Sequence, residues 1–148
     1  MLLAFDLDGT LVDSRDAVLK SYRAAGVEPP KDFWGKPWQE WLSDRKAHDH
    51  KNREFSKIDT LKTVKRLRTM DLFQQDHSIV LTGASFEAAQ AVLAFYDLRP
   101  KSLFTELNVQ AKVETLKALD PGIYFDDDKT VCDAVKERTR WTVMHVQP

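Results

Sequence analysis

Short apolar runs alternate along the chain with longer amphipathic stretches. Five of these runs are three to six residues long, and most are rich in β-branched or aromatic side chains, which is typical of buried strands. The first run stops at Asp6, where polar residues and Gly9 follow. The predicted strands are residues 2–5, 78–82, 102–107, 123–125 and 141–146.

Between these runs, apolar residues recur at helical spacing. Leu61, Val64, Leu67 and Met70 lie three residues apart with lysines and arginines between them, which predicts an amphipathic helix across this segment. Three further helices are predicted. One is capped by Ser85 and ends at Arg99-Pro100, one covers about 111–119, and one covers 129–138.

Strands that alternate with helices of about ten residues favour a parallel sheet with helices on both faces. We therefore expect a doubly wound, Rossmann-like α/β fold. Residues 13–55 break the alternation, because they contain two helical stretches and no strand candidate. We expect a core of residues 1–12 and 56–148, with residues 13–55 inserted as a small helical cap.

The composition is that of an ordinary globular domain, with 148 residues, 43% hydrophobic residues and a formal net charge of -1. A charge so close to zero argues against a protein that coats nucleic acid, because such binding relies on many Lys and Arg contacts to phosphates. Cys132 is the single cysteine, so no intramolecular disulfide can form and a cytoplasmic location is expected. The apolar stretches predict neither a signal peptide nor a membrane span.

Polar residues suited to chemistry follow the predicted strands. Asp6-Leu7-Asp8-Gly9-Thr10 comes after the first strand, Thr82-Gly83 after the second, and Asp126-Asp127-Asp128 after the fourth. Lys112 lies near the start of a predicted helix. Parallel sheets bind ligands at the carboxyl ends of their strands, so we expect these residues to meet at one edge. Alternatively, the three consecutive acids form a solvated loop that caps the next helix.

This ordered set of motifs resembles the haloacid dehalogenase superfamily of phosphohydrolases across the α/β core, without a close match in the insert. The resemblance implies a phosphatase that uses Mg²⁺ and forms an aspartyl phosphate. Asp6 would attack the phosphorus, and Asp8 would protonate the leaving oxygen and later deprotonate the attacking water. Positions two apart in an extended strand end project to the same side, which would let both carboxylates face one phosphorus.

The resemblance also implies a set of ligands. Asp6, Asp127 and the backbone carbonyl of Asp8 would bind Mg²⁺, while Asp126 would hold a metal-bound water. The sequence leaves open whether Asp128 or Asp133 joins this metal site.

For the phosphate, the resemblance implies that Lys112 offsets the charge between Asp6 and the substrate, although Lys101 or Lys117 could be argued for instead. The remaining phosphate ligands would be the Thr82 hydroxyl and the backbone N–H groups of Leu7, Asp8 and Gly83.

The segment from Ile123 through Asp126-Asp127 to the helix after it resembles the closing motif of the 3′-phosphatase domain of polynucleotide kinase/phosphatase, with Asp128 in place of an arginine. The expected substrate is therefore a nucleotide, a nucleic-acid 3′-phosphate end or another small phosphorylated metabolite. The chain has no Gly-x-x-x-x-Gly-Lys-Ser/Thr match, so no companion kinase activity is expected.

The insert interleaves aromatic and basic residues, among them Trp34, Lys36, Trp38, Trp41 and Arg45. Such a surface can stack nucleobases, but the helical spacing of the tryptophans favours the core of a small cap instead. Two alternative functions stay open: a phosphomutase of the same superfamily and a non-catalytic phosphate- or protein-binding module. We expect no obligate protein partner, and the sequence does not indicate an oligomeric state.

Overall fold

The structure, a computed structural model, describes residues 1–147 and divides into two compact units. Unit 1 consists of Met1–Asp13 and Arg66–Pro148, and unit 2 is the segment Ser14–Lys65. The second boundary therefore falls at residue 65 rather than at residue 55. The shift has a physical reason, because helix α3 (Ile58–Leu61) packs against helix α1 (Arg15–Ala24) within unit 2.

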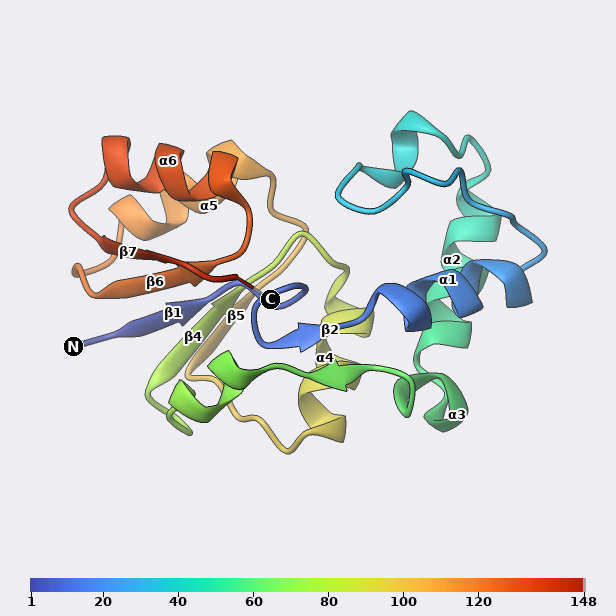
Figure 1. Ribbon diagram of the computed structural model, residues 1–148, viewed down its shortest axis with the longest axis horizontal. Helices are drawn as coiled ribbons and strands as arrows, with labels where there is room; N and C mark the ends of the chain where they lie inside the picture. The colour runs from blue at the N-terminus through green and yellow to red at the C-terminus, as the bar shows by residue number, and fades with distance from the viewer. Residues whose placement is uncertain (148) are drawn as a thin grey trace. The chain divides into compact units, whose positions relative to one another are not determined.

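Unit 1 is built on a five-stranded sheet with the order β5-β4-β1-β6-β7, in which all neighbouring strands run parallel (Figure 1). The first strand of the chain occupies the centre, so Phe5 pairs with Val80 on one side and with Phe125 on the other. This sheet confirms the predicted α/β fold. Its strands are β1 (Leu3–Phe5), β4 (Ser78–Leu81), β5 (Ser102–Phe104), β6 (Ile123–Asp126) and β7 (Thr142–His145).

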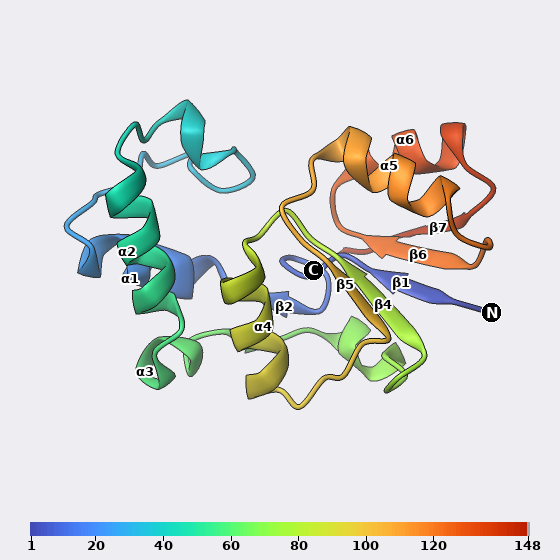
Figure 2. The same cartoon turned by 180° about the vertical axis from the view of Figure 1, so that it is seen from behind.

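Three helices of unit 1 cover the sheet. Helices α5 (Val109–Lys117) and α6 (Lys129–Arg138) contact each other over one face, whereas α4 (Phe86–Phe95) lies on the other side (Figures 1 and 2). The Ser85 hydroxyl accepts a hydrogen bond from the Ala88 N–H, which confirms the predicted cap of α4. The helix predicted over 129–138 has the bounds expected.

Alternation along the strands separates two apolar layers. Ala4, Ile79, Leu81 and Tyr124 point into one core with α5, α6 and the indole of Trp141. Phe5 faces the other side, where its ring stacks on Phe125 at 4.8 Å and lies 5.7 Å from Phe73. Because both faces are covered, the strands read as continuous apolar runs rather than as alternating ones.

The amphipathic helix predicted across 61–70 is wrong. The segment instead contains the end of α3, the short strand β3 (Lys65–Arg66) and a 3-10 turn, η2 (Arg68–Leu72). Strand β3 pairs with β2 (Val12–Asp13), and the N–H of Leu67 donates to the carbonyl of Leu11. Strand pairing between distant segments thus outweighs the local helical periodicity, although Val64 and Met70 are still buried.

Unit 2 has an interior of aromatic rings between α1 and α2 (Arg45–Phe55). Tyr22 packs edge-on against Trp41 at 4.9 Å, and Trp38 stacks on His48 at 4.0 Å. The tryptophans do not share a regular helix, since only a short 3-10 turn, η1 (Trp38–Glu40), lies between α1 and α2. Trp38 and Trp41 thus pack against rings inside the unit, which favours the packing role over the stacking of nucleobases.

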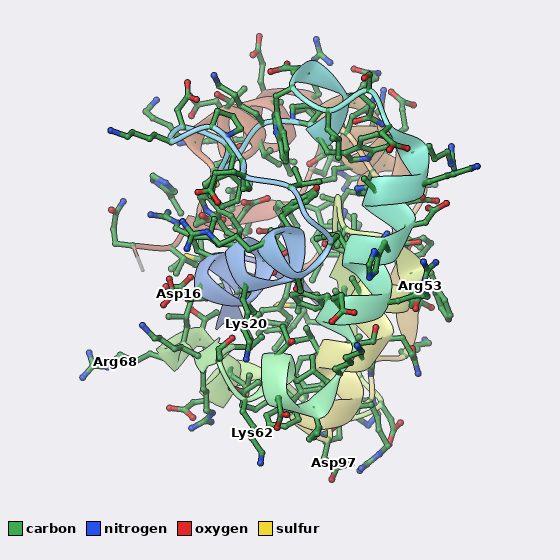
Figure 3. The ribbon with its side chains drawn as sticks, turned by 90° about the vertical axis from the view of Figure 1, so that its right-hand side faces the viewer. Asp16, Lys20, Arg53, Lys62, Arg68 and Asp97 are labelled. Carbon is green, nitrogen blue, oxygen red and sulfur yellow. The ribbon has the colours of Figure 1, made fainter. Side chains whose placement is uncertain are left out.

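Charged side chains form the outer surface of unit 2. Asp16, Lys20, Arg53 and Lys62 are exposed (Figure 3). The unit carries twelve Lys and Arg residues against eight Asp and Glu residues, so it has a net positive charge. Among residues 1–147, no helix combines the length and the apolar character needed to cross a bilayer.

Candidate active site

The sheet register brings the predicted site residues of unit 1 to one edge. Asp6 directly follows the central strand β1, and its N–H donates to the carbonyl of Phe125 at 2.9 Å. Phe5 pairs with Phe125, so Asp6 lies opposite Asp126, the last residue of β6. Thr82 follows β4, the strand on the other side of β1. Asp6, Thr82 and Asp126 therefore lie at the same edge of the sheet, as expected from their positions after the predicted strands.

Three carboxylates converge at this edge. Asp6, Asp126 and Asp127 each offer an oxygen, and these atoms lie within 4.8 Å of one another. Asp6 and Asp126 are buried, and Asp127 is half-buried. Burial raises the pKa of Asp6 well above its ordinary value, while the nearby Lys112 opposes this effect. Three carboxylates at this spacing stay ionised together only if cations neutralise them.

Lys112 is the cation that the described residues supply. Its Nζ donates to Asp6 Oδ1 at 2.8 Å and lies 3.4 Å from Asp126 Oδ2. Burial alone would favour the neutral amine, but the charges of Asp6 and Asp126 raise the pKa of Lys112 above its ordinary value. The structure therefore brings Lys112 to Asp6, whereas Lys101 is exposed and Lys117 lies near Glu114 at 4.0 Å.

The Asp126 carboxylate is held by hydrogen bonds on both oxygens. Oδ1 accepts from the N–H of Asp128 at 2.9 Å, and Oδ2 accepts from the Tyr124 hydroxyl. Burial, and then the charge of Asp126, raises the pKa of Tyr124, so the phenol is protonated and donates. Tyr124 is not among the site residues predicted from the sequence, although its position two residues before Asp126 in a strand was the available signal.

A tight turn after Asp6 brings the backbone of Gly9 close to the Asp127 carboxylate. The Leu7 carbonyl accepts from the N–H groups of Leu11 at 3.0 Å and Val12 at 3.2 Å. Gly9 has a φ of 86°, and a Cβ placed there would lie 2.2 Å from Asp127 Oδ2. Only a residue without a side chain lets Asp127 approach this closely.

Asp8 lies inside this turn, where its backbone forms an isolated bridge with Val12. The extended strand ends at Phe5 and Leu7 is in a bend, so strand alternation does not set the direction of the Asp8 side chain. That the Asp6 and Asp8 carboxylates face one phosphorus stays a prediction. The acid–base role of Asp8 stays a prediction.

Two further side chains that the sequence analysis did not single out contact Asp127. The Thr10 hydroxyl lies 3.4 Å from Asp127 Oδ1 and 3.3 Å from Asp6 Oδ2, which links the two carboxylates. The His145 Nε2 lies 3.0 Å from the Asp127 carbonyl oxygen. The Thr10 contact fixes the loop after β6 relative to the turn after β1, and the His145 contact fixes it relative to the end of β7.

The predicted phosphate ligands Thr82 and Gly83 follow β4. Thr82 is buried, and its Oγ1 accepts a hydrogen bond from the N–H of Ala84 at 3.1 Å. This bond uses an acceptor position of the hydroxyl and leaves its hydrogen for donation to an anion. Leu7 is buried at the start of the turn after β1.

Asp128 and Asp133 are not members of the carboxylate cluster among the described residues. Asp128 is the N-cap of α6, where its Oδ1 accepts from the N–H of Thr130 at 2.8 Å. Asp133 pairs with Lys129 at 2.8 Å on the exposed face of α6. The expectation that a solvated acid caps this helix thus holds for Asp128 alone, while Asp126 and Asp127 turn toward Asp6.

The donor set fits a hard divalent cation. Mg²⁺ prefers oxygen ligands and keeps several waters, so one or two carboxylates are enough on the protein side. Asp6 and Asp127 are better suited to direct coordination than Asp126. Lys112 binds only one of the two Asp6 oxygens, whereas both Asp126 oxygens already accept hydrogen bonds.

Replacing Gly9 with alanine tests the role of the close approach to Asp127. We expect Gly9→Ala to weaken Mg²⁺ binding by about 10- to 100-fold, because the new Cβ displaces a side chain of the cluster. Isothermal titration calorimetry measures this loss. The matched control is Gly26→Ala, since Gly26 has a similar φ of 80° with no atom within 4 Å of an added Cβ. Equal Mg²⁺ affinity in the two variants would contradict the assignment.

Comparison with solved structures finds the same fold in several proteins. A haloacid dehalogenase-like family hydrolase, SP0104 from Streptococcus pneumoniae, matches with a TM-score of 0.71 and 17% identity, over 99% of this chain and 84% of that one. CbbY from Rhodobacter sphaeroides, solved in complex with phosphate, matches with a TM-score of 0.65 and 14% identity, over 99% and 86% of the chains. Phosphatase Tt82 from Thermococcus thioreducens gives a TM-score of 0.62 and 15% identity, over 99% and 92%.

No protein-family model and no curated protein matches the chain. The structural matches nevertheless cover almost all of it, which shows that the chain has the haloacid dehalogenase-like fold.

Proposed function

We propose that this protein is a Mg²⁺-dependent phosphomonoester hydrolase that uses Asp6 as a covalent nucleophile. The observation that carries the proposal is the position of the Asp6 carboxylate, which has Lys112 at 2.8 Å on Oδ1 and belongs to a three-carboxylate cluster with Asp126 and Asp127. A carboxylate can attack a phosphate dianion only where cations neutralise the charge that accumulates. The names of the structural matches, among them a hydrolase and a phosphatase, agree with this chemistry.

In the first step, an Asp6 oxygen forms a bond to phosphorus while the bond from phosphorus to the leaving oxygen breaks. Asp8 gives its proton to that leaving oxygen. In the second step, water attacks the phosphorus, its proton goes to Asp8, and the bond between Asp6 and phosphorus breaks. Asp6, Asp127 and the Asp8 carbonyl would bind Mg²⁺, and Asp126 would hold a metal-bound water. The bound Mg²⁺ would neutralise charge on the phosphoryl oxygens.

The remaining residues act on the phosphoryl oxygens. The Lys112 ammonium lies beside the attacking carboxylate, where it lowers the repulsion between Asp6 and the phosphate. The Thr82 hydroxyl and the N–H groups of Leu7, Asp8 and Gly83 would donate to the other phosphoryl oxygens.

Unit 2 is proposed to act as the cap that selects the leaving group. Its excess of basic over acidic residues favours anionic substrates, because a positive surface attracts phosphate esters. A nucleotide, a nucleic-acid 3′-phosphate end or another small phosphorylated metabolite is the proposed substrate class. The single cysteine supports a cytoplasmic location.

Phosphate release from a panel of esters tests the proposal. We expect Mg²⁺-dependent release from p-nitrophenyl phosphate, and selective release from one class among mononucleotides, 3′-phosphorylated oligonucleotides and sugar phosphates. Chelation of the metal with EDTA should abolish the activity, and added Mg²⁺ should restore it. Activity that persists in EDTA, or no release from any ester, would contradict the proposal. A strong preference for sugar phosphates would overturn the nucleic-acid part of it.

The two alternative functions give different results in the same panel. A phosphomutase would transfer phosphate between positions of a sugar phosphate without releasing it. A non-catalytic binding module would bind inorganic phosphate but would turn over no ester.

A further inference from the structure

Tyr124 is a buried hydroxyl that the proposed reaction does not use. The residue has no exposed surface, and its hydroxyl donates to Asp126 Oδ2. The same oxygen lies 3.4 Å from the Lys112 Nζ, which in turn donates a hydrogen bond to Asp6 Oδ1 at 2.8 Å. A continuous line of polar contacts therefore runs from Tyr124 through Asp126 and Lys112 to the proposed nucleophile.

Strand alternation explains why these groups meet. Tyr124 and Asp126 are two residues apart in β6, so both side chains point to the face that α5 covers. Lys112 belongs to the first half of α5 and reaches the sheet from that face. The contact is thus set by the packing of α5 on β6, and it does not depend on a mobile loop.

The hydrogen bonds on Asp126 leave the carboxylate little freedom to turn. The Asp128 N–H fixes Oδ1 at 2.9 Å, and the Tyr124 hydroxyl fixes Oδ2 on the side of Lys112. Without the phenol, the carboxylate could rotate about its terminal torsion, which is broad for aspartate. The Lys112 ammonium would then lose its second anchor and leave its position beside Asp6.

We infer that Tyr124 is a positioning residue that, through Asp126, holds the Lys112 ammonium against Oδ1 of Asp6. The catalytic consequence of this role rests on the proposed function. The role is distinct from a packing role, since the ring of Tyr124 fills the core between β6 and α5 whether or not it carries the hydroxyl.

Tyr124→Phe removes the hydroxyl and keeps the ring, so it separates the two roles. We expect kcat for p-nitrophenyl phosphate to fall about tenfold with KM changed less than twofold, since the lost hydrogen bond holds Asp126, and through it Lys112, beside the attacking carboxylate and takes no part in substrate binding. The matched control is Tyr96→Phe, which makes the same chemical change at the end of α4 and should leave kcat unchanged.

A coupling test asks whether Tyr124 acts through Asp126. We expect Tyr124→Phe to have little further effect on kcat in an Asp126→Asn background, because the proposed path has already been broken. If the fold-losses in kcat of Tyr124→Phe and Asp126→Asn multiply in the double variant, Tyr124 does not act through Asp126. An unchanged kcat in Tyr124→Phe, or an equal loss in Tyr96→Phe, would overturn the positioning role.

An NMR measurement needs no turnover, so it tests the positioning role of Tyr124 independently of the proposed function. The ¹⁵N-labelled ammonium of Lys112 should give an NMR signal in the folded protein, because burial and hydrogen bonds protect its hydrogens from exchange, and Lys112→Met assigns that signal. We expect Tyr124→Phe to shift or broaden it, while Tyr96→Phe leaves it unchanged. If the wild-type protein hydrolyses no ester but the signal responds, the proposed function fails and the positioning role stands. A signal that does not respond to Tyr124→Phe overturns the positioning role, whatever the enzyme activity.

Discussion

Asp6→Asn is expected to lower the rate of Mg²⁺-dependent ester hydrolysis by at least about 10⁴-fold, because the amide cannot form the covalent bond to phosphorus that the proposed mechanism needs. The substitution is nearly isosteric, and its Oδ1 can still accept the hydrogen bond from Lys112. Steady-state release of p-nitrophenol measures the effect. A thermal melt should show a folded protein, which separates loss of the nucleophile from loss of the fold.

The matched control for this change is Asp120→Asn. Asp120 is exposed and lies before β6, so it belongs to the opposite end of the strand from Asp126. We expect this variant to retain the wild-type rate. Equal rates for wild type and Asp6→Asn would end the enzyme hypothesis and leave a binding module as the interpretation of the fold.

Lys112→Met is expected to have the second-largest effect, and it should act on both activity and stability. Hydrolysis should fall by about 10²- to 10³-fold, because the cation beside the attacking carboxylate is lost. The free energy of unfolding should fall by about 3 kcal/mol at neutral pH, since the substitution leaves Asp6 and Asp126 buried without their counter-charge. Steady-state kinetics and urea denaturation, both carried out at fixed pH, measure the two effects.

Lys117→Met makes the same change five residues further along α5, where the ammonium is exposed and lies 4.0 Å from Glu114. Exposed pairs of this kind contribute about 0–1 kcal/mol, so this variant should be close to wild type in stability and rate. A similar loss in both variants would mean that charge on the helix as a whole matters, and not the contact of Lys112 with Asp6.

The strands and their order along the chain followed from local patterns. Apolar runs such as 78–82 mark buried strands whatever their partners are, because both faces of a covered parallel sheet exclude water. Polar residues directly after such runs must lie at the carboxyl edge, so the sequence alone was enough to place Asp6, Thr82 and Asp126 there. Ser85 as a helix cap is similarly local, since the bond from its hydroxyl spans three residues.

Local patterns failed where distant segments compete for the same residues. The spacing of Leu61, Val64, Leu67 and Met70 fits a helix, yet the N–H of Leu67 bonds to Leu11 and the chain returns to unit 1 as a strand and a 3-10 turn. The tryptophans of unit 2 fit a helix by spacing as well, but Trp38 lies in a short 3-10 turn and Trp34 and Trp41 lie in turns outside any helix.

The sequence by itself determined the α/β class, the ordered acidic motifs and the residues that could carry the chemistry, because these depend on neighbours along the chain. Only the tertiary structure decided which groups touch. The packing of separate elements brings the Lys112 ammonium to Asp6 and Asp126. The same packing sets the hydrogen bond from the Tyr124 hydroxyl to Asp126 and the close approach of Asp127 to Gly9. Local periodicity records which side of an element is buried, but not which atom of another element it meets there.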